Sequence, residues 1–285
     1  MGRFANTAQA EAWNGYEGDQ WARNQDRWDA VNDGFNQLLL DAAAITESNV
    51  VLDIGCGAGR TTRLAARRAS RGQALGLDLS GPMLGRARES ALREGVENVS
   101  FVQGDAQVHP FDTGGFDAVI SRYGMTFFAD PEAAFANLHR ALRPGGRLAF
   151  ICAAEAEGNE WLKALASLEG ILPLGGFGKP GDPGMFSLTD PDRIRALLTA
   201  GGFTGARVRR IEVPGKWGAD AADAAAFLLD SGPGRHLLSQ VSPKAQAQAR
   251  QALTDTLRGH EEDGAVWLRS SSWLVTVETA GTARS

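Results

Sequence analysis

The sequence predicts an α/β fold in which a mostly parallel β-sheet carries helices on both faces. Short apolar runs alternate with helical patterns over residues 49–154, and a glycine-rich turn follows the first apolar run. Strands that alternate with helices form βαβ units, and right-handed crossovers place the helices on the two faces of the sheet.

The elements of this region follow one another in order. Strands are expected at 49–55, 73–79, 98–105, 116–122 and 147–154, and helices at 60–70, 82–94 and 130–142. Pro82 and Pro131 suit the first turn of a helix, and Asp130 suits the N-cap position. Sheets of this kind bind ligands beyond the carboxyl ends of their strands, where the glycine-rich turn also lies.

The two ends of the chain are less regular. Residues 1–45 are expected to form a helical cap, because the aromatic side chains of residues 8–30 need a surface to pack on and an amphipathic helix follows at 32–45. Residues 46–285 form the main domain, with a later helix at 190–200 and strands at 206–213 and 271–279. The insertions at 155–189 and 219–263 are interpreted as a substrate lid, since long insertions in compact domains are often functional.

Composition narrows the functional classes. The formal net charge is −5, and the densest basic group has helical spacing, which favours a solvated helix face over a phosphate-binding patch. That group is Arg60, Arg63, Arg67, Arg68 and Arg71. We therefore expect no nucleic-acid partner. Two unpaired cysteines, the absence of a signal peptide and the lack of a run of about 20 apolar residues predict a cytoplasmic protein with no membrane segment. The histidines lack metal-ligand spacing, so no metal is expected.

The turn Asp53-Ile54-Gly55-Cys56-Gly57-Ala58-Gly59 is the part of the sequence that indicates chemistry. Gly55 and Gly57 allow backbone conformations that a Cβ forbids and let a ligand lie against the main chain. A dinucleotide-binding turn would need a glycine at position 60, where the sequence has Arg60. Asp53 would repel a pyrophosphate and attract the ammonium group of an amino-acid ligand.

This turn resembles the first motif of the class I S-adenosylmethionine-dependent methyltransferases. Further motifs follow in the family's order: Asp78 in GLDLS, Gly104-Asp105-Ala106, FDAVISRYGMTFF at 116–128 and LRPGGRLAF at 142–150. The resemblance is strong over residues 45–155 and looser towards the C-terminus. It implies a Rossmann-like sheet of seven strands with the last strand antiparallel, and S-adenosyl-L-methionine as the cofactor. The segment WNGYEGDQW also resembles small-molecule members of the family that carry an N-terminal helical cap.

The resemblance implies roles for individual residues. Asp78 would hold the ribose hydroxyls, because a carboxylate accepts two hydrogen bonds, and Asp105 would contact the adenine amino group. Trp21 would either cover the sulfonium by cation–π attraction or only pack the cap. Arg122 would either bind a carboxylate or form a structural ion pair. The expected cofactor-binding residues are Trp21, Asp53, Gly55, Cys56, Gly57, Gly59, Asp78, Leu79, Met83, Gly104, Asp105, Ala106, Ser121 and Arg122.

The expected activity is in-line methyl transfer to a small-molecule acceptor of specialised metabolism. Because the cofactor carries the reactive group, the protein contributes placement and electrostatics, and no catalytic base is indicated by the sequence. The methylated atom (oxygen, nitrogen or carbon) and the oligomeric state are left open. A peptide or protein methyltransferase and a non-catalytic relative that binds the cofactor are the alternatives. SRYG at 121–124 disfavours a base-amino methyltransferase of nucleic acids, which carries an Asn/Asp-Pro-Pro-Tyr-like signature there.

Overall fold

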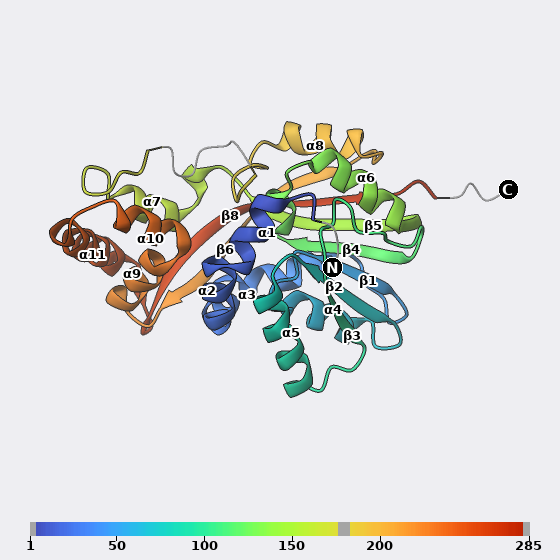
Figure 1. Ribbon diagram of the computed structural model, residues 1–285, viewed down its shortest axis with the longest axis horizontal. Coiled ribbons are helices and arrows are strands. Elements are labelled where there is room, and N and C mark those ends of the chain that lie inside the picture. Colours follow the sequence, from blue (N-terminus) through green and yellow to red (C-terminus); the bar gives the residue numbers. More distant parts are fainter. Residues whose placement is uncertain (1–3, 176–182, 282–285) are drawn as a thin grey trace.

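The computed structural model describes residues 4–175 and 183–281. Its strands form one sheet in the order β3-β2-β1-β4-β5-β8-β6, and the short β7 pairs with β8 (Figure 1). β1 to β5 run parallel, whereas β8 is antiparallel to both β5 and β6. The bounds are β1 Val50–Ile54, β2 Gln73–Asp78, β3 Val99–Gln103, β4 Phe116–Arg122, β5 Leu142–Ala153, β6 Arg207–Gly218, β7 Glu261–Glu262 and β8 Ala265–Glu278. The predicted Rossmann-like sheet with an antiparallel last strand is confirmed.

Helices connect these strands in the predicted order. The α-helices are α1 Thr7–Asn14, α2 Tyr16–Arg23, α3 Gln25–Ala42, α4 Arg60–Arg68, α5 Gly81–Arg93, α6 Pro131–Ala141, α7 Glu160–Ala166, α8 Pro191–Ala200, α9 Ala221–Asp230, α10 Gly232–Ser239 and α11 Pro243–Leu257. The 3-10 turns are η1 Gly124–Phe127, η2 Ala156–Gly158 and η3 Arg258–His260. At α6 the carboxylate of Asp130 accepts the N–H of Ala133 at 3.0 Å, which is the predicted N-cap.

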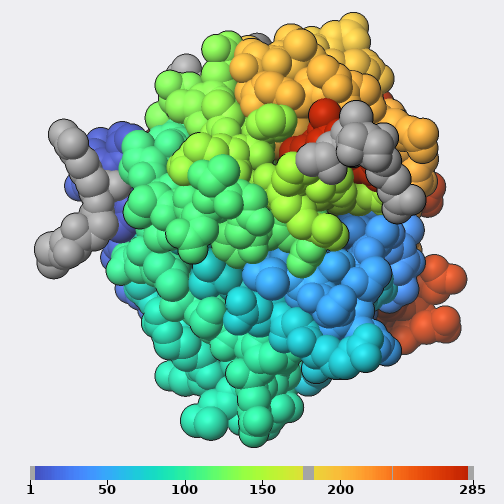
Figure 2. All heavy atoms as spheres, turned by 90° about the vertical axis from the view of Figure 1, so that its right-hand side faces the viewer, coloured from blue at the N-terminus to red at the C-terminus, as the bar shows by residue number. Residues whose placement is uncertain are grey.

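Neighbouring residues of the central strands pack against opposite helical layers, as the alternation of side chains along a strand requires. Val51 belongs to a buried cluster with Phe35 of α3 and Ala65 of α4, whereas Leu52 belongs to a cluster with Phe135 of α6. Helices α6 and α8 lie above the sheet in Figure 1 and α3 and α4 lie below it. Figure 2 views the molecule from the end opposite α11 and shows mainly the segments of α3 to α8 packed side by side.

The last two long strands extend past their predicted bounds. β6 continues from 213 to Gly218, and β8 begins at Ala265 instead of 271. Pro214 and Gly215 obscure this extension in the sequence. A Cβ at Gly215 would lie 2.3 Å from the carbonyl oxygen of Val31, so close packing against α3 requires glycine there. The extension carries α7, α9, α10 and α11 at one end of the molecule, where they form a separate apolar core.

The N-terminal region and the segment at 155–189 both contain helices. Residues before 45 are helical, although α3 begins at Gln25 rather than at 32. The insertion at 155–189 contains η2 and α7, and its residues 176–182 lie outside the described part of the chain. Among residues 4–175 and 183–281, no helix has the length and apolar character that crossing a bilayer requires.

Arg63 does not lie on the solvated helix face predicted for the arginine group. Its side chain is 2% exposed and its guanidinium lies 3.0 Å from the carboxylate of Glu94. It also donates a hydrogen bond to the carbonyl of Ala58 at 2.8 Å. A buried guanidinium needs such partners, and Glu94, just after α5, supplies a charge that the helical spacing alone does not reveal.

Candidate cofactor and acceptor site

The glycine-rich turn joins β1 to α4 at the carboxyl edge of the sheet. Gly55, Gly57 and Gly59 have φ angles of 63°, 54° and 76°, in the left-handed region that favours glycine. The N–H groups of Gly55 and Cys56 donate to the carbonyl of Leu77 at 2.8 and 3.2 Å, which holds the turn against β2. A Cβ on Gly57 would lie 2.6 Å from Cε of Met83, so glycine lets the Met83 side chain lie against the main chain of the turn.

Asp78 closes β2 and faces this turn. One carboxylate oxygen accepts the N–H of Gly57 at 2.7 Å and the other accepts the N–H of Ser80 at 2.8 Å. Burial raises the pKa of Asp78, and these backbone donors oppose the rise. Each oxygen keeps a further lone pair for a ligand hydroxyl.

Asp105 follows β3 and is covered by the N-terminal segment. One of its carboxylate oxygens accepts the N–H groups of Ala5 and Asn6 at 2.9 and 2.8 Å. The other accepts the N–H of Gln107 at 3.0 Å. Residues 5 and 6 therefore lie directly over the end of the third strand.

Asp53 lies at the end of β1 and is fully buried. The hydroxyl groups of Thr61 and Thr62 each donate to its Oδ2 at 2.7 Å, whereas its Oδ1 has no hydrogen-bond partner in the described part of the chain. Burial raises the pKa of Asp53 to about 6, against the effect of the two threonine hydroxyls. Oδ1 of Asp53 is therefore a buried hydrogen-bond acceptor that is left unsatisfied.

Arg122 and Tyr123 end β4 and begin the loop after it. Arg122 donates to Oδ1 of Asn36 at 2.5 Å and lies 3.9 Å from the carboxylate of Asp29, so it has the structural ion pair that the sequence left open. Tyr123 has φ of 66°, a strained value for a residue with a side chain. Its hydroxyl lies 2.9 Å from Oγ of Ser272 in β8.

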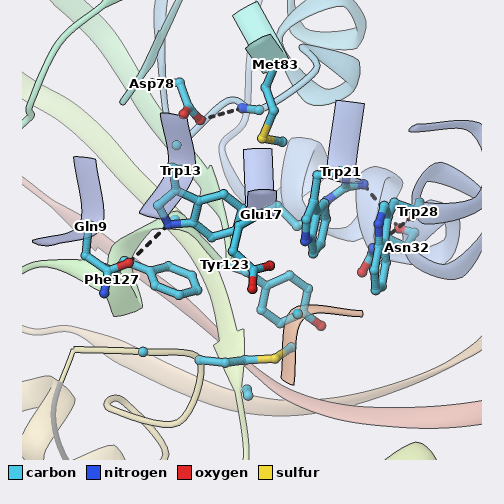
Figure 3. Close-up of a pocket in the computed structure, with 18 of the residues that line it drawn as sticks. Gln9, Trp13, Glu17, Trp21, Trp28, Asn32, Asp78, Met83, Tyr123 and Phe127 are labelled. Atoms are coloured by element: carbon cyan, nitrogen blue, oxygen red, sulfur yellow. Dashed lines mark hydrogen bonds between the residues drawn. The ribbon is translucent and has the colours of Figure 1, made fainter. Parts of the chain in front are cut away.

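A single cavity of about 540 Å³ runs along these strand ends and continues beneath the helical cap. Its far part is walled by five tryptophan rings, those of Trp13, Trp21, Trp28, Trp161 and Trp217. Trp21 and Trp28 stack with ring centroids 4.0 Å apart, and Trp28 meets Trp217 edge-on at 6.2 Å. Figure 3 shows Trp13, Glu17, Trp21 and Trp28 side by side along one wall.

Most of the predicted site residues line this cavity: Trp21, Gly55, Gly57, Asp78, Leu79, Met83, Gly104, Asp105, Ala106 and Arg122. Asp53, Cys56, Gly59 and Ser121 do not line it. The hydroxyl of Ser121 donates to the carbonyl of Ile54 at 2.7 Å. Cys56 is buried, and burial raises the pKa of its thiol well above the ordinary value, which suits a passive residue.

Several residues that line the cavity were not predicted from the sequence. Glu17, Trp161 and Trp217 all face the cavity. For Glu17 a signal existed, because it lies four residues before Trp21 and so shares its face of α2. Trp161 and Trp217 lie in the two late segments, where nothing local marks them as cavity residues. Within residues 4–175 and 183–281, no group of acidic, cysteine or histidine side chains could hold a metal ion.

The chain is similar to known methyltransferases. A family model described as "Methyltransferase domain" matches residues 51–146. A demethylmenaquinone methyltransferase from Thermus thermophilus is 32% identical over 179 residues, covering 60% of this chain and 81% of the relative. A ubiquinone/menaquinone biosynthesis C-methyltransferase from Pseudomonas aeruginosa is 29% identical over 196 residues, covering 62% and 77%.

A solved structure shares the fold. Phosphoethanolamine N-methyltransferase 2 of Haemonchus contortus, in complex with phosphomonomethylethanolamine and S-adenosylhomocysteine, superimposes with a TM-score of 0.59 at 19% identity, over 98% of this chain and 61% of that one. Together with the sequence relatives, the fold and the strand-end cavity, this places the chain in the class I S-adenosylmethionine-dependent methyltransferases. It transfers a methyl group from S-adenosylmethionine to a small-molecule acceptor.

The residues present fit this cofactor. The spare lone pairs of Asp78 suit a ribose, and Gly57, which lines the cavity without a side chain, lets a ligand lie against the main chain.

Proposed function

We propose that the chain methylates a ring carbon of a hydroxylated aromatic acceptor. The observation that carries this proposal is the wall of tryptophan rings beyond the glycine-rich turn, made of Trp13, Trp21, Trp28, Trp161 and Trp217. Flat aromatic walls favour a flat aromatic ligand, because offset and edge-to-face contacts add to the burial of apolar surface. The names of the sequence relatives support the same acceptor class, and one of them is a C-methyltransferase of quinone biosynthesis.

We place the cofactor at the strand ends. In this placement Asp78 binds the ribose hydroxyls, Asp105 contacts the adenine, and the turn at Gly55 and Gly57 supports the main body of the ligand. The methionine end then points towards Arg122, in the direction of the tryptophan wall. These roles keep the assignments that the family resemblance implies, and the lining of the cavity supports them.

The late insertions form the acceptor side of the cavity in this proposal. Trp161 of α7, Trp217 at the end of β6 and Leu228 of α9 all line it. With the N-terminal helices α1 and α2 opposite, the acceptor is enclosed between a cap and a lid. Such enclosure excludes water and holds the two reactants in line.

S-adenosylmethionine, when bound, supplies an electrophilic methyl group on a sulfonium. The protein's part is to orient the acceptor ring, to keep bulk water away from the reacting atoms and to accept the proton of the acceptor's hydroxyl. An apolar aromatic wall orients the ring and keeps water away. A charged side chain inside such a cavity can affect the proton transfer.

The test is a product assay with matched acceptors. Purified protein and S-adenosylmethionine are incubated with a hydroquinone-type naphthalenediol, with its O-methylated form and with an aliphatic amine, and the products are identified by mass spectrometry and NMR. We expect a ring C-methylated product from the diol. Methylation of the amine alone would contradict the proposed acceptor class while leaving the cofactor intact.

A further inference from the structure

Within the described part of the chain, Glu17 is a carboxylate without a partner in the aromatic part of the cavity. It belongs to α2, lines the cavity and lies between Trp13 and Trp21 in the close-up (Figure 3). In residues 4–175 and 183–281 no hydrogen bond or ion pair to its carboxylate is found, whereas arginines of α3, α5 and α10 pair with other acids: Arg27 with Asp223, Arg86 with Glu89 and Arg235 with Asp230. Burial raises the pKa of Glu17 above its ordinary value.

The other titratable residues that line the cavity are committed to other interactions. The carboxylates of Asp78 and Asp105 already accept backbone N–H groups. Arg122 is a cation held by Asn36 and Asp29. The hydroxyl of Tyr123 bonds with Ser272, and burial raises the pKa of Tyr123 far above its ordinary value, so it stays protonated. Of the lining residues, Glu17 alone is left to accept a proton.

The fold builds a place for this carboxylate against the lid. A Cβ added to Gly232, the first residue of α10, would lie 1.4 Å from Oε1 and 2.4 Å from Oε2 of Glu17. The glycine therefore leaves the space that the carboxylate fills. The neighbouring Tyr16 fixes α2 in the same place: its hydroxyl donates to the carbonyl of Asp230 at 3.2 Å, and its ring lies 4.5 Å from the guanidinium of Arg235.

We propose that Glu17 is the catalytic base that binds the hydroxyl of the aromatic acceptor and takes its proton. The inference rests on the proposed function, because it needs an acceptor with an ionisable hydroxyl. The hydroxyl proton passes to the Glu17 carboxylate, the ring carbon beside that hydroxyl forms a bond to the methyl group, and the carbon–sulfur bond breaks with its electron pair left on sulfur. Loss of the ring proton to water leaves an aromatic oxyanion, and the protonated Glu17 returns its proton to that oxygen, which restores the hydroxyl and the free carboxylate.

The first test is Glu17→Gln, which keeps the shape of the side chain and removes the base. We expect kcat for the neutral diol to fall about 100-fold or more, the size of effect that a general base contributes. Affinities for S-adenosylmethionine and S-adenosylhomocysteine, measured by calorimetry, should stay within about twofold. These affinities also show that the variant folds.

An acceptor that is already ionised separates a base from a residue that only shapes the cavity. A hydroxynaphthoquinone, whose hydroxyl is ionised at neutral pH, does not need a base. For it the ratio of wild-type to Glu17→Gln rates should approach one, whereas a structural role would depress both acceptors alike. A similar loss for both acceptors, or no loss for the diol, would overturn the proposal.

Gly232→Ala displaces the carboxylate without changing Glu17. We expect a kcat for the diol at least tenfold lower than that of the wild type, whereas Gly259→Ala, at a glycine with no atom within 4 Å of its added Cβ, should change nothing. Wild-type activity in Gly232→Ala would contradict the proposal. If the wild-type protein methylates amines and no aromatic diol, the proposed function itself fails. If it methylates the diol and Glu17→Gln does so equally well, this inference alone fails.

Discussion

The backbone N–H of Gly57 donates to the carboxylate of Asp78 at 2.7 Å, so the glycine-rich turn after β1 is held by the end of β2. The two parts of the cofactor site are therefore one unit. We predict that Asp78→Ala weakens S-adenosylmethionine binding at least tenfold, which is about 1.4 kcal/mol. The variant loses the contacts to the ligand and also the hydrogen bond that fixes the glycine-rich turn. Isothermal titration calorimetry measures the effect.

Asp192→Ala is the control for Asp78→Ala, because Asp192 lies in α8 with a side chain that is 89% exposed. It should bind the cofactor like the wild type. Unchanged affinity in Asp78→Ala would remove this residue from the cofactor site, whatever its place in the fold.

Asp53 makes the stability of the protein depend on pH. Burial raises its pKa to about 6 from the ordinary 3.8, so the folded state binds a proton more tightly than the unfolded state. Its contribution to the free energy of unfolding is therefore present at low pH and is lost as the pH rises through about 6. Asp53→Asn removes this dependence. Relative to the wild type, the variant should gain roughly 1.4 kcal/mol between pH 5 and pH 7.5.

Urea unfolding of both proteins at the two pH values measures this difference. The comparison cancels the other acidic groups, which both proteins share. A stability difference that is the same at pH 5 and pH 7.5 would show that the carboxyl of Asp53 keeps its ordinary pKa in the folded state.

The sequence was informative where the structure is determined by local pattern. Strands and helices over residues 49–154 have their own apolar periodicity, and Asp78 and Asp105 stand at strand ends, where parallel topology collects side chains. Their backbone partners were not predictable in the same way. Asp105 binds the N–H groups of Ala5 and Asn6, about 100 positions earlier in the chain, and no local pattern links such segments.

The individual residues Trp161 and Trp217 could not be predicted, for the same reason. Trp217 lies in the extension of β6, which Pro214 and Gly215 hide in the sequence, and Trp161 of α7 packs on it with ring centroids 5.8 Å apart. The sequence also does not show which of two neighbouring residues at a strand end points into the cavity. Ser121 points to the carbonyl of Ile54, whereas its neighbour Arg122 lines the cavity.

Gly59 is predicted to serve packing rather than ligand contact. It has φ of 76°, and a Cβ there would lie 2.7 Å from Cε1 of Phe101 and 2.9 Å from Cβ of Ala87. Gly59→Ala should therefore lower the free energy of unfolding by about 1–3 kcal/mol. Gly85→Ala, in the middle of α5 with no atom within 4 Å of the added Cβ, should raise it by about 0.5–1 kcal/mol. Equal stability of the two variants would contradict this role.

Trp21 is predicted to recognise the positive charge of the cofactor. One face of its ring is stacked on Trp28 at 4.0 Å, and the residue also lines the cavity. An aromatic face attracts a sulfonium but not the neutral thioether of S-adenosylhomocysteine, and the difference is worth about 1 kcal/mol. Trp21→Leu should therefore weaken the binding of S-adenosylmethionine about fivefold relative to that of S-adenosylhomocysteine, as measured by calorimetry with both ligands.

Trp28→Leu is the matched control, because it removes the stacked partner and leaves the cavity face of Trp21 in place. The ratio of its affinities for the two ligands should match that of the wild type. If both variants lose affinity for the two ligands in the same proportion, Trp21 only packs the cap and does not recognise the positive charge of the sulfonium.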